Sequence, residues 1–254
     1  MLKFIKIMVK PRLLVTRFAP HAQQVAEKLN EQGIFSIAQP LLKIEEVEHP
    51  VSIFHKPYDI VIAISCNAVE YSDKQCKNTW PNARYFAVGK ATQLLLTTKI
   101  DQSVFIPETD FSSEGLLALP MLQQLTNQTV LILRGVGGRE FLRDQLILRG
   151  ASVDYYESYQ RVAIKLSRST TAHKWQQQAI NGAIISSIEL LEQLIKITAY
   201  EDQRWLKSLT LFASSERILE YATNLGFQKT VLLASISNQE LINYFTDEGS
   251  YDRD

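Results

Sequence analysis

Short apolar runs alternate with amphipathic stretches along the chain. The first run, Arg12–Thr16 (RLLVT), predicts a buried strand, and apolar residues at helical spacing follow it as far as Gly33. Because strands that are apolar throughout must be covered on both faces, the pattern predicts parallel sheets between layers of helices. The later predicted strands are Tyr58–Ser65, Arg84–Val88, Thr129–Leu133, Gly182–Ile185, Leu209–Ala213 and Thr230–Leu233.

Glycines mark the ends of three predicted helices, at Gly33, Gly150 and Gly226. Two long segments without a clear helix, Ile34–Val47 and Ser152–Leu166, interrupt the rhythm, and we interpret them as connectors between two domains. Loose similarities between strand–helix units in the two parts of the chain favour two similar α/β units. Chance sharing of a common pattern explains them equally well.

Composition and charge limit the classes of function that the chain can have. The 254 residues include 27 Lys and Arg against 27 Asp and Glu, and 46% are hydrophobic, as in ordinary globular proteins. A net charge of zero argues against a broad electrostatic surface for nucleic acid or a membrane. Two cysteines and four scattered histidines form no metal-binding pattern. We expect a cytoplasmic monomer without a signal peptide, with an N-terminal extension in which Met8 is an alternative start.

The residues after the predicted strands share one chemical character. In an open parallel sheet, ligands bind beyond the carboxyl ends of the strands, where small, hydroxyl and cationic residues at helix starts suit an anion. The alternative is that each Ser or Thr only caps its helix. The candidate binding residues are Thr16, Arg17, Ser65, Asn67, Gly89, Thr92, Arg134, Gly137, Gly138, Arg139, Ser186, Ser187, Ser215 and Arg217.

Familiar cofactor and nucleophile motifs are missing from the sequence. The loop RGVGGRE (Arg134–Glu140) is neither a P-loop nor a dinucleotide fingerprint, and no GxSxG occurs. Of three clustered tyrosines, we expect Tyr155 and Tyr156 to pack, whereas spacing leaves open whether Tyr159 packs or faces a ligand.

At these residues the chain resembles the uroporphyrinogen-III synthase family. The strongest similarity is LILRGVGGREFLRDQLILRGASV (Leu131–Val153) followed by ESYQRV (Glu157–Val162). The other matching pieces are LLVTR (Leu13–Arg17), ISCNAV (Ile64–Val69), AVGKAT (Ala87–Thr92) and SSEGLLAL (Ser112–Leu119), with weaker ones at Ile184–Ser187, Ser215–Phe227 and Asn238–Phe245.

The resemblance implies a fold of two doubly wound, flavodoxin-like α/β domains joined by a two-stranded ladder, with the active site in the cleft. The implied first domain is discontinuous and comprises residues 1–36 and 165–254. The ladder comprises 37–47 and 153–164, and the second domain 48–152.

The implied activity is that of a lyase of heme biosynthesis. It closes the linear tetrapyrrole hydroxymethylbilane to uroporphyrinogen III, with loss of water and inversion of ring D. No metal or cofactor is implied. The substrate carries many carboxylates, in agreement with the anion-binding character of the strand ends. Tyr159 matches the family's proposed proton donor, and an unstable substrate would make transient contact with the enzyme that produces the bilane useful.

One loop departs from the family pattern. Many members have Gly-Pro-Thr-Thr-Ala or similar residues where this chain has Ser215–Leu219 (SERIL), so that Arg217 stands in place of the expected hydroxyls. The departure leaves an alternative function open, a non-catalytic two-domain module that binds an anionic ligand.

Overall fold

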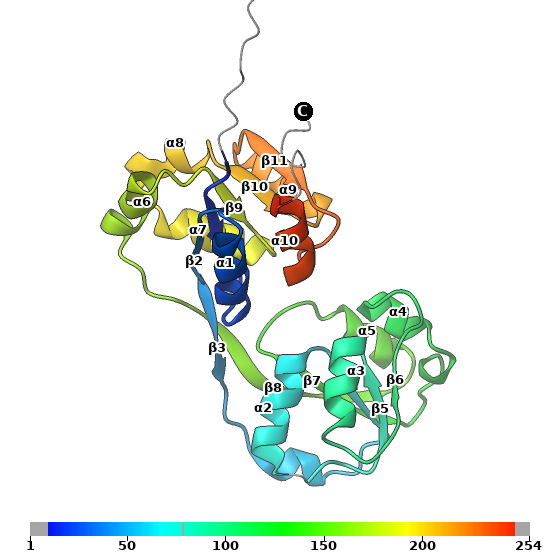
Figure 1. Ribbon diagram of the computed structural model, residues 1–254. Coiled ribbons are helices and arrows are strands. Elements are labelled where there is room, and N and C mark those ends of the chain that lie inside the picture. Colours follow the sequence, from blue (N-terminus) through cyan, green and yellow to red (C-terminus); the bar gives the residue numbers. More distant parts are fainter. Residues whose placement is uncertain (1–9, 78, 247–254) are drawn as a thin grey trace, which may run out of the picture. The chain divides into compact units, whose positions relative to one another are not determined.

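The computed structural model describes residues 10–77 and 79–246, and these divide into two compact units. Unit 1 takes its described residues from Met1–Lys43 and Val162–Asp254, and unit 2 from Ile44–Arg161 (Figure 1). The chain therefore passes between the units twice, within β3 (Leu42–Glu46) and β8 (Ser152–Ala163). The alternative start at Met8 lies outside the described residues.

Unit 1 contains a parallel five-stranded sheet in the order β11-β10-β9-β1-β2. Its core forms two clusters, one on each face of the sheet. Helices α1 and α10 cover one face, and α6, α7 and α9 cover the other. The elements are β1 (Leu13–Val15), α1 (His21–Glu31), β2 (Ser36–Ala38), α6 (Arg168–Gln177), β9 (Gly182–Ile184), α7 (Ile188–Ile197), α8 (Gln203–Leu206), β10 (Thr210–Ala213), α9 (Glu216–Asn224), β11 (Lys229–Leu232) and α10 (Asn238–Thr246).

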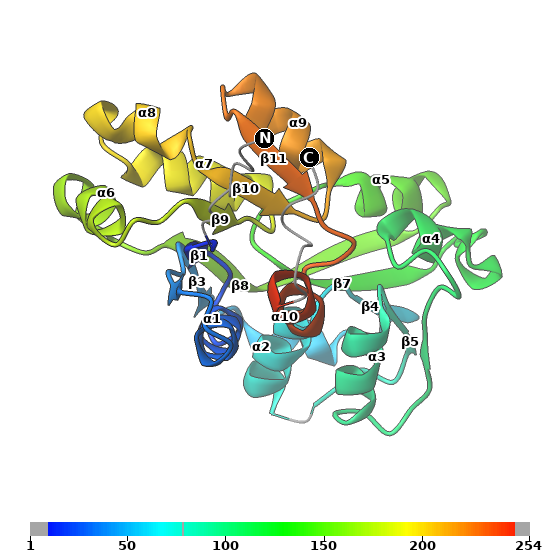
Figure 2. The same ribbon diagram turned by 45° about the horizontal axis from the view of Figure 1, so that its top comes forward.

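Unit 2 contains a six-stranded sheet in the order β3-β8-β7-β4-β5-β6. Helices α2 and α3 cover one face, and α4 and α5 cover the other (Figure 2). The elements in addition to β3 and β8 are β4 (Ile60–Ala63), α2 (Cys66–Cys76), β5 (Arg84–Ala87), α3 (Lys90–Thr97), β6 (Val104–Phe105), α4 (Ser113–Ala118), β7 (Thr129–Gly135) and α5 (Phe141–Leu148). Short 3-10 turns occupy Val51–His55, Pro120–Leu122 and, in unit 1, Tyr200–Asp202.

The central strand β4 shows why these sequences form covered sheets. All four of its residues are buried, and side chains alternate between the faces. Ile60 and Ile62 join the core beneath α4 and α5, whereas Val61 and Ala63 join the core beneath α2. Burial of each Ile or Val side chain stabilises the fold by about 1.5–3 kcal/mol. The α/β class with largely parallel sheets is thus confirmed.

The predicted helix ends are confirmed as well. Gly33, Gly150 and Gly226 follow α1, α5 and α9 with φ values of 76°, 93° and 91°. In this left-handed conformation a glycine has no Cβ to clash with the backbone, so each ends its helix without strain.

The extended connectors differ in detail from the predicted separate ladder. β2 pairs with β1, and β8 pairs with β7 along most of its length, so both strands belong to the main sheets. A ladder between β3 and β8 also exists, with Val47 N–H bound to Ser158 O at 3.0 Å and Ile164 N–H to Leu41 O at 2.9 Å. Residue numbers rise on one strand as they fall on the other, so this pairing is antiparallel. With 12 residues, β8 spans about 40 Å, which is long enough to pair on both sides.

Candidate functional site

Each sheet has a switch point, which is a pair of adjacent strands from which the chain continues toward opposite edges of the sheet. In unit 2, β4 leads to β5 on one side through α2, whereas β7 leads to β8 on the other side through α5. α2 and α5 lie on opposite faces, so their N-terminal ends leave room beyond the carboxyl ends of β4 and β7. Ligands bind at such switch points in open α/β sheets. In unit 1 the equivalent strands are β1 and β9.

Because the strands are parallel, the predicted residues of each sheet lie together at the carboxyl ends of its strands. In unit 2 they lie at or after the ends of the adjacent strands β7, β4 and β5, and Tyr159 of β8 pairs with Gly135, the last residue of β7. In unit 1 they follow β1, β9 and β10, which are also adjacent. These residues thus lie at the carboxyl ends of adjacent strands.

Ser65 and Tyr159 form the most specific contact at the unit 2 switch point. Ser65 is the N-cap of α2, and its Oγ accepts a hydrogen bond from Ala68 N–H at 3.1 Å. The same Oγ lies 3.1 Å from the phenol oxygen of Tyr159. The Tyr159 side chain is buried, and the Tyr71 ring stacks beside it with a centroid distance of 6.0 Å. Asn67, half-buried, lies in the first turn of α2. Packing and hydrogen bonding therefore both fix the phenol.

Arg134, at the end of β7, is occupied by the protein itself. Its side chain is 3% exposed, and it donates to Gly135 O at 3.1 Å, to Glu140 Oε1 at 3.0 Å and to Gly137 O. Its guanidinium also lies 4.4 Å from the centroid of the Tyr155 ring. Arg134 therefore holds the loop in shape and has little surface left for a ligand.

Tyr155 and Tyr156 have protein partners, as expected for packing residues. Tyr155 donates to Glu140 Oε2 at 2.7 Å, which lowers the pKa of that carboxyl, while burial raises the pKa of Tyr155 to about 12. Burial also raises the pKa of Tyr156 to about 12. Both phenols keep their protons near neutral pH.

The residues after Arg134 are the accessible part of the β7 loop. Gly137 and Gly138 have φ values of 75° and 100°, and both are exposed. Arg139 is 66% exposed and pairs with Glu114 at 2.6 Å, which lowers the pKa of the Glu114 carboxyl. An exposed pair of this kind is worth little, so an incoming carboxylate can replace Glu114.

The end of β5 adds two of the predicted residues to the candidate site. Gly89 is the N-cap of α3, and Thr92 is buried one turn later, with its Oγ1 3.8 Å from Cys66 Sγ. The partly exposed Phe111 ring lies beside this helix start, with Lys90 Nζ 5.4 Å from its centroid. Phe111 was not predicted, because it follows a strand too short to recognise from the sequence.

At the switch point of unit 1, Thr16 and Arg17 follow β1. Thr16 is completely buried, and its hydroxyl donates to Ile184 O at 2.7 Å, which joins β1 to β9. Arg17 donates to Asn238 Oδ1 at 2.7 Å, and burial lowers its pKa. Thr16 therefore has a structural role in this conformation, whereas Arg17 is only half-buried.

The remaining predicted residues of unit 1 start two helices. Ser187 caps α7 by accepting from Leu190 N–H at 3.2 Å, and Ser186 beside it is half-buried. Ser215 precedes α9 without a side-chain cap bond. Arg217 is exposed in the first turn of α9. The capping alternative therefore holds for Ser187 and Ser65, but not for Ser215.

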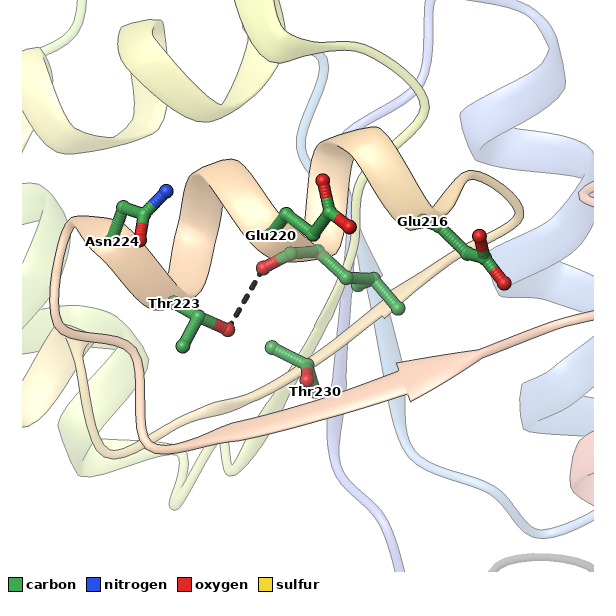
Figure 3. Close-up of a pocket in the computed structure, with 6 residues that line it drawn as sticks. Glu216, Glu220, Thr223, Asn224 and Thr230 are labelled. Atoms are coloured by element: carbon green, nitrogen blue, oxygen red, sulfur yellow. Dashed lines mark hydrogen bonds between the residues drawn. The ribbon is translucent and has the colours of Figure 1, made fainter.

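A surface pocket lies elsewhere, along α9 and the edge strand β11. It has a volume of about 520 Å³ and is lined by Glu216, Leu219, Glu220, Thr223, Asn224 and Thr230 (Figure 3). Two glutamates make it unsuitable for an anion, and Thr223 Oγ1 is already bonded to Leu219 O at 2.9 Å. We therefore assign no role in anion binding to this pocket.

Sequence reasoning missed several partners that only the fold brings together. Tyr71, stacked on Tyr159, and Asn238, bound to Arg17, are separated from them by 88 and 221 residues. No local pattern marks Tyr71, and Asn238 was noted only as the first residue of a weak family match. Among residues 10–77 and 79–246, no group of three His, Cys, Asp or Glu side chains could hold a metal ion. None of the described helices has the length and apolar character needed to cross a membrane.

Comparison with known proteins identifies relatives of this chain. The family model described as "Uroporphyrinogen-III synthase HemD" matches residues 23–243. The uroporphyrinogen-III synthase of Escherichia coli K12 is 32% identical over 240 residues, covering 91% of this chain and 98% of that protein. That of Proteus mirabilis is 33% identical over 204 residues, covering 76% and 99%.

Two solved structures share the fold. A mutant uroporphyrinogen III synthase of the extremely thermophilic bacterium Thermus thermophilus matches with a TM-score of 0.63 and 14% identity, covering 91% of this chain and 96% of that one. The Helicobacter pylori enzyme matches with a TM-score of 0.60 and 16% identity, covering 92% and 97%. Together with the sequence matches, these findings show that the chain belongs to the uroporphyrinogen-III synthase family, the cyclising lyases of heme biosynthesis.

Proposed function

We propose that this chain converts hydroxymethylbilane to uroporphyrinogen III, with departure of the hydroxyl as water and inversion of ring D before the macrocycle closes. Membership of the family supports this reaction. The observation that carries the assignment of the chemistry is the Ser65–Tyr159 contact of 3.1 Å at the unit 2 switch point.

Tyr159 is the donor to the departing hydroxyl in this proposal. Ser65 Oγ already accepts from Ala68 N–H, which favours donation of the Ser65 proton to the phenol oxygen. The phenol proton then remains free for the substrate. As the carbon–oxygen bond breaks, electrons from the pyrrole nitrogen stabilise the remaining cation, and the hydroxyl takes the proton and leaves as water.

The carboxylates of the substrate contact the accessible strand-end residues. In unit 2 these are Arg139 and the backbone of Gly137 and Gly138, which are exposed. In unit 1, Arg17, Ser186 and Arg217 have accessible surface. Most of the catalytic effect would then come from holding the flexible linear substrate in a reactive conformation.

The product isomer tests the proposal directly. Hydroxymethylbilane is supplied to the purified chain, and the porphyrin isomers are separated after oxidation. We expect isomer III, with the same chain after thermal unfolding as the control. Isomer I alone, the product of spontaneous closure, would contradict the proposal and favour a non-catalytic anion-binding module.

We further propose a cytoplasmic location and transient contact with the enzyme that makes the bilane. An unstable substrate gives such contact a purpose, since released bilane closes to isomer I. In a coupled assay at constant flux, direct transfer predicts less isomer I than addition of free bilane at the same rate. An equal fraction of isomer I would contradict direct transfer.

A further inference from the structure

The Tyr159 side chain has to cross a neighbouring strand to reach Ser65. Tyr159 is on β8, Ser65 follows β4, and β7 lies between these strands. Two strand spacings amount to about 10 Å, which two side chains can bridge only if the tyrosine ring lies flat across β7. The residue of β7 that pairs with Tyr159 is Gly135.

Gly135 leaves the space that the ring occupies. A Cβ atom built on Gly135 would be 2.6 Å from both Cε2 and Cζ of Tyr159, and 3.1 Å from Cδ2. Real Cβ contacts are essentially never this short, so any other residue at position 135 must displace the ring. Gly135 has no positive φ, so the close contact with the ring, and not backbone conformation, accounts for a glycine here.

A bulge in β8 directs Tyr159 onto the correct face. The register changes from Arg134 opposite Glu157 to Gly135 opposite Tyr159, so that Ser158 is an extra residue. In a regular strand, Tyr156 and Tyr159 would point to opposite faces because they are three residues apart. Here both belong to the core on the α2 face, which also carries Ser65.

We propose that Gly135 is a positioning residue for the Tyr159 hydroxyl. Three neighbours define the place of the phenol: Gly135 beneath the ring, Tyr71 stacked at 6.0 Å, and Ser65 at the oxygen. The catalytic part of this inference rests on the proposed function. The steric part does not, because it concerns only the folded chain.

A kinetic cycle tests the catalytic part. Gly135→Ala should reduce kcat about tenfold or more, the loss expected when one hydrogen bond to the transition state is removed, with a smaller change in KM. In the Tyr159→Phe background, Gly135→Ala should reduce kcat no further, because the hydroxyl is already absent. Equal reductions in the two backgrounds would overturn the positioning role.

A stability cycle tests the steric part without any substrate. Gly135→Ala should lower Tm by several degrees when Tyr159 is present, and much less in the Tyr159→Ala background, where the ring is gone. The double variant therefore remains informative even if Gly135→Ala alone does not fold. The same loss of Tm in both backgrounds would overturn the steric inference, whatever the chain catalyses.

Gly182→Ala is the matched control. This glycine lies in the other sheet, where a Cβ would be 2.9 Å from both Leu13 Cδ2 and Phe212 Cε2. It should lower Tm through similar crowding, but its effects should add to those of Tyr159→Ala. If the loss of Tm caused by Gly182→Ala also disappeared in the Tyr159→Ala background, the stability cycle would not be specific for Gly135. The steric inference would then lose its support.

Discussion

Ser65 combines two roles at the scale of a single residue, and a matched pair of variants separates them. It caps α2 through Ala68 N–H at 3.1 Å and also contacts the Tyr159 hydroxyl. Ser112 caps α4 through Gly115 N–H at the same 3.1 Å, and α4 covers the opposite face of the sheet from Tyr159. Each Ser→Ala change should cost about 1 kcal/mol of stability through the lost cap.

Only Ser65→Ala should also impair turnover. We expect its kcat to fall toward that of Tyr159→Phe, which should lose rate clearly while keeping its fold. Ser112→Ala should retain wild-type kcat. Thermal unfolding and isomer III formation, measured on the three variants, check this; equal kcat values for Ser65→Ala and Ser112→Ala would remove Ser65 from the mechanism.

Arg139 provides a second prediction at this scale. Glu114 is exposed and holds Arg139 only weakly, so Arg139 is available to a carboxylate of the substrate. We therefore expect Arg139→Ala to raise KM several-fold with little change in kcat. Glu114→Gln should lower KM, since it removes a carboxylate that competes with the substrate. The KM ratio of Arg139→Ala to wild type should shrink as salt screens the interaction. A ratio of one at low salt would contradict a carboxylate contact.

At the scale of the element, the β7 loop shows how far the sequence leads. The strand, its position before a helix, and the glycine at the helix end followed from apolar periodicity and a glycine preference, both local properties. The role of Arg134 did not follow, since its partners Gly137, Glu140 and Tyr155 are set by how the loop folds back. Short or polar elements, such as β6 with two residues and α6 (RSTTAHKWQQ), also lack the apolar pattern that reveals a strand or helix.

Arg134→Ala should therefore act through the loop. It removes hydrogen bonds to the carbonyls of Gly135 and Gly137, at a cost of about 1–3 kcal/mol. We expect a lower Tm and faster proteolysis within residues 135–140, together with a higher KM. An Arg134→Ala variant with wild-type Tm and a raised KM would instead assign Arg134 to the substrate.

At the scale of the whole molecule, the sequence alone could not reveal which strands share a sheet. Unit 1 combines β1 and β2 with β9, β10 and β11, and more than 130 residues of chain separate the two groups. Apolar periodicity identifies strands but carries no information about their neighbours. The discontinuous first domain was expected only from the family resemblance, and so was the role of Tyr159 as proton donor.

The division into units predicts an order of acid unfolding. Among the described residues, the carboxyls whose pKa is lowered by hydrogen bonds are all in unit 2: Asp59, Glu114, Glu140 and Asp154. A carboxyl with a lowered pKa in the folded state stabilises the fold above its ordinary value, 3.8 for Asp or 4.5 for Glu, and this stabilisation is lost as the pH falls through the folded value. Unit 2 should therefore unfold at a higher pH than unit 1.

Tryptophan fluorescence can follow the units separately, because Trp80 lies in unit 2 whereas Trp175 and Trp205 lie in unit 1. Trp80→Phe leaves the unit 1 signal, and Trp175→Phe with Trp205→Phe leaves that of unit 2. We expect the Trp80 transition at the higher pH.

A double variant tests the carboxyls themselves. Asp59→Asn with Asp154→Asn should lower the urea midpoint of unit 2 near neutral pH but hardly change it in acid, where the wild-type carboxyls are already protonated. Coincident or reversed acid transitions would contradict this order and indicate that the units unfold together, or that other groups dominate their acid stability.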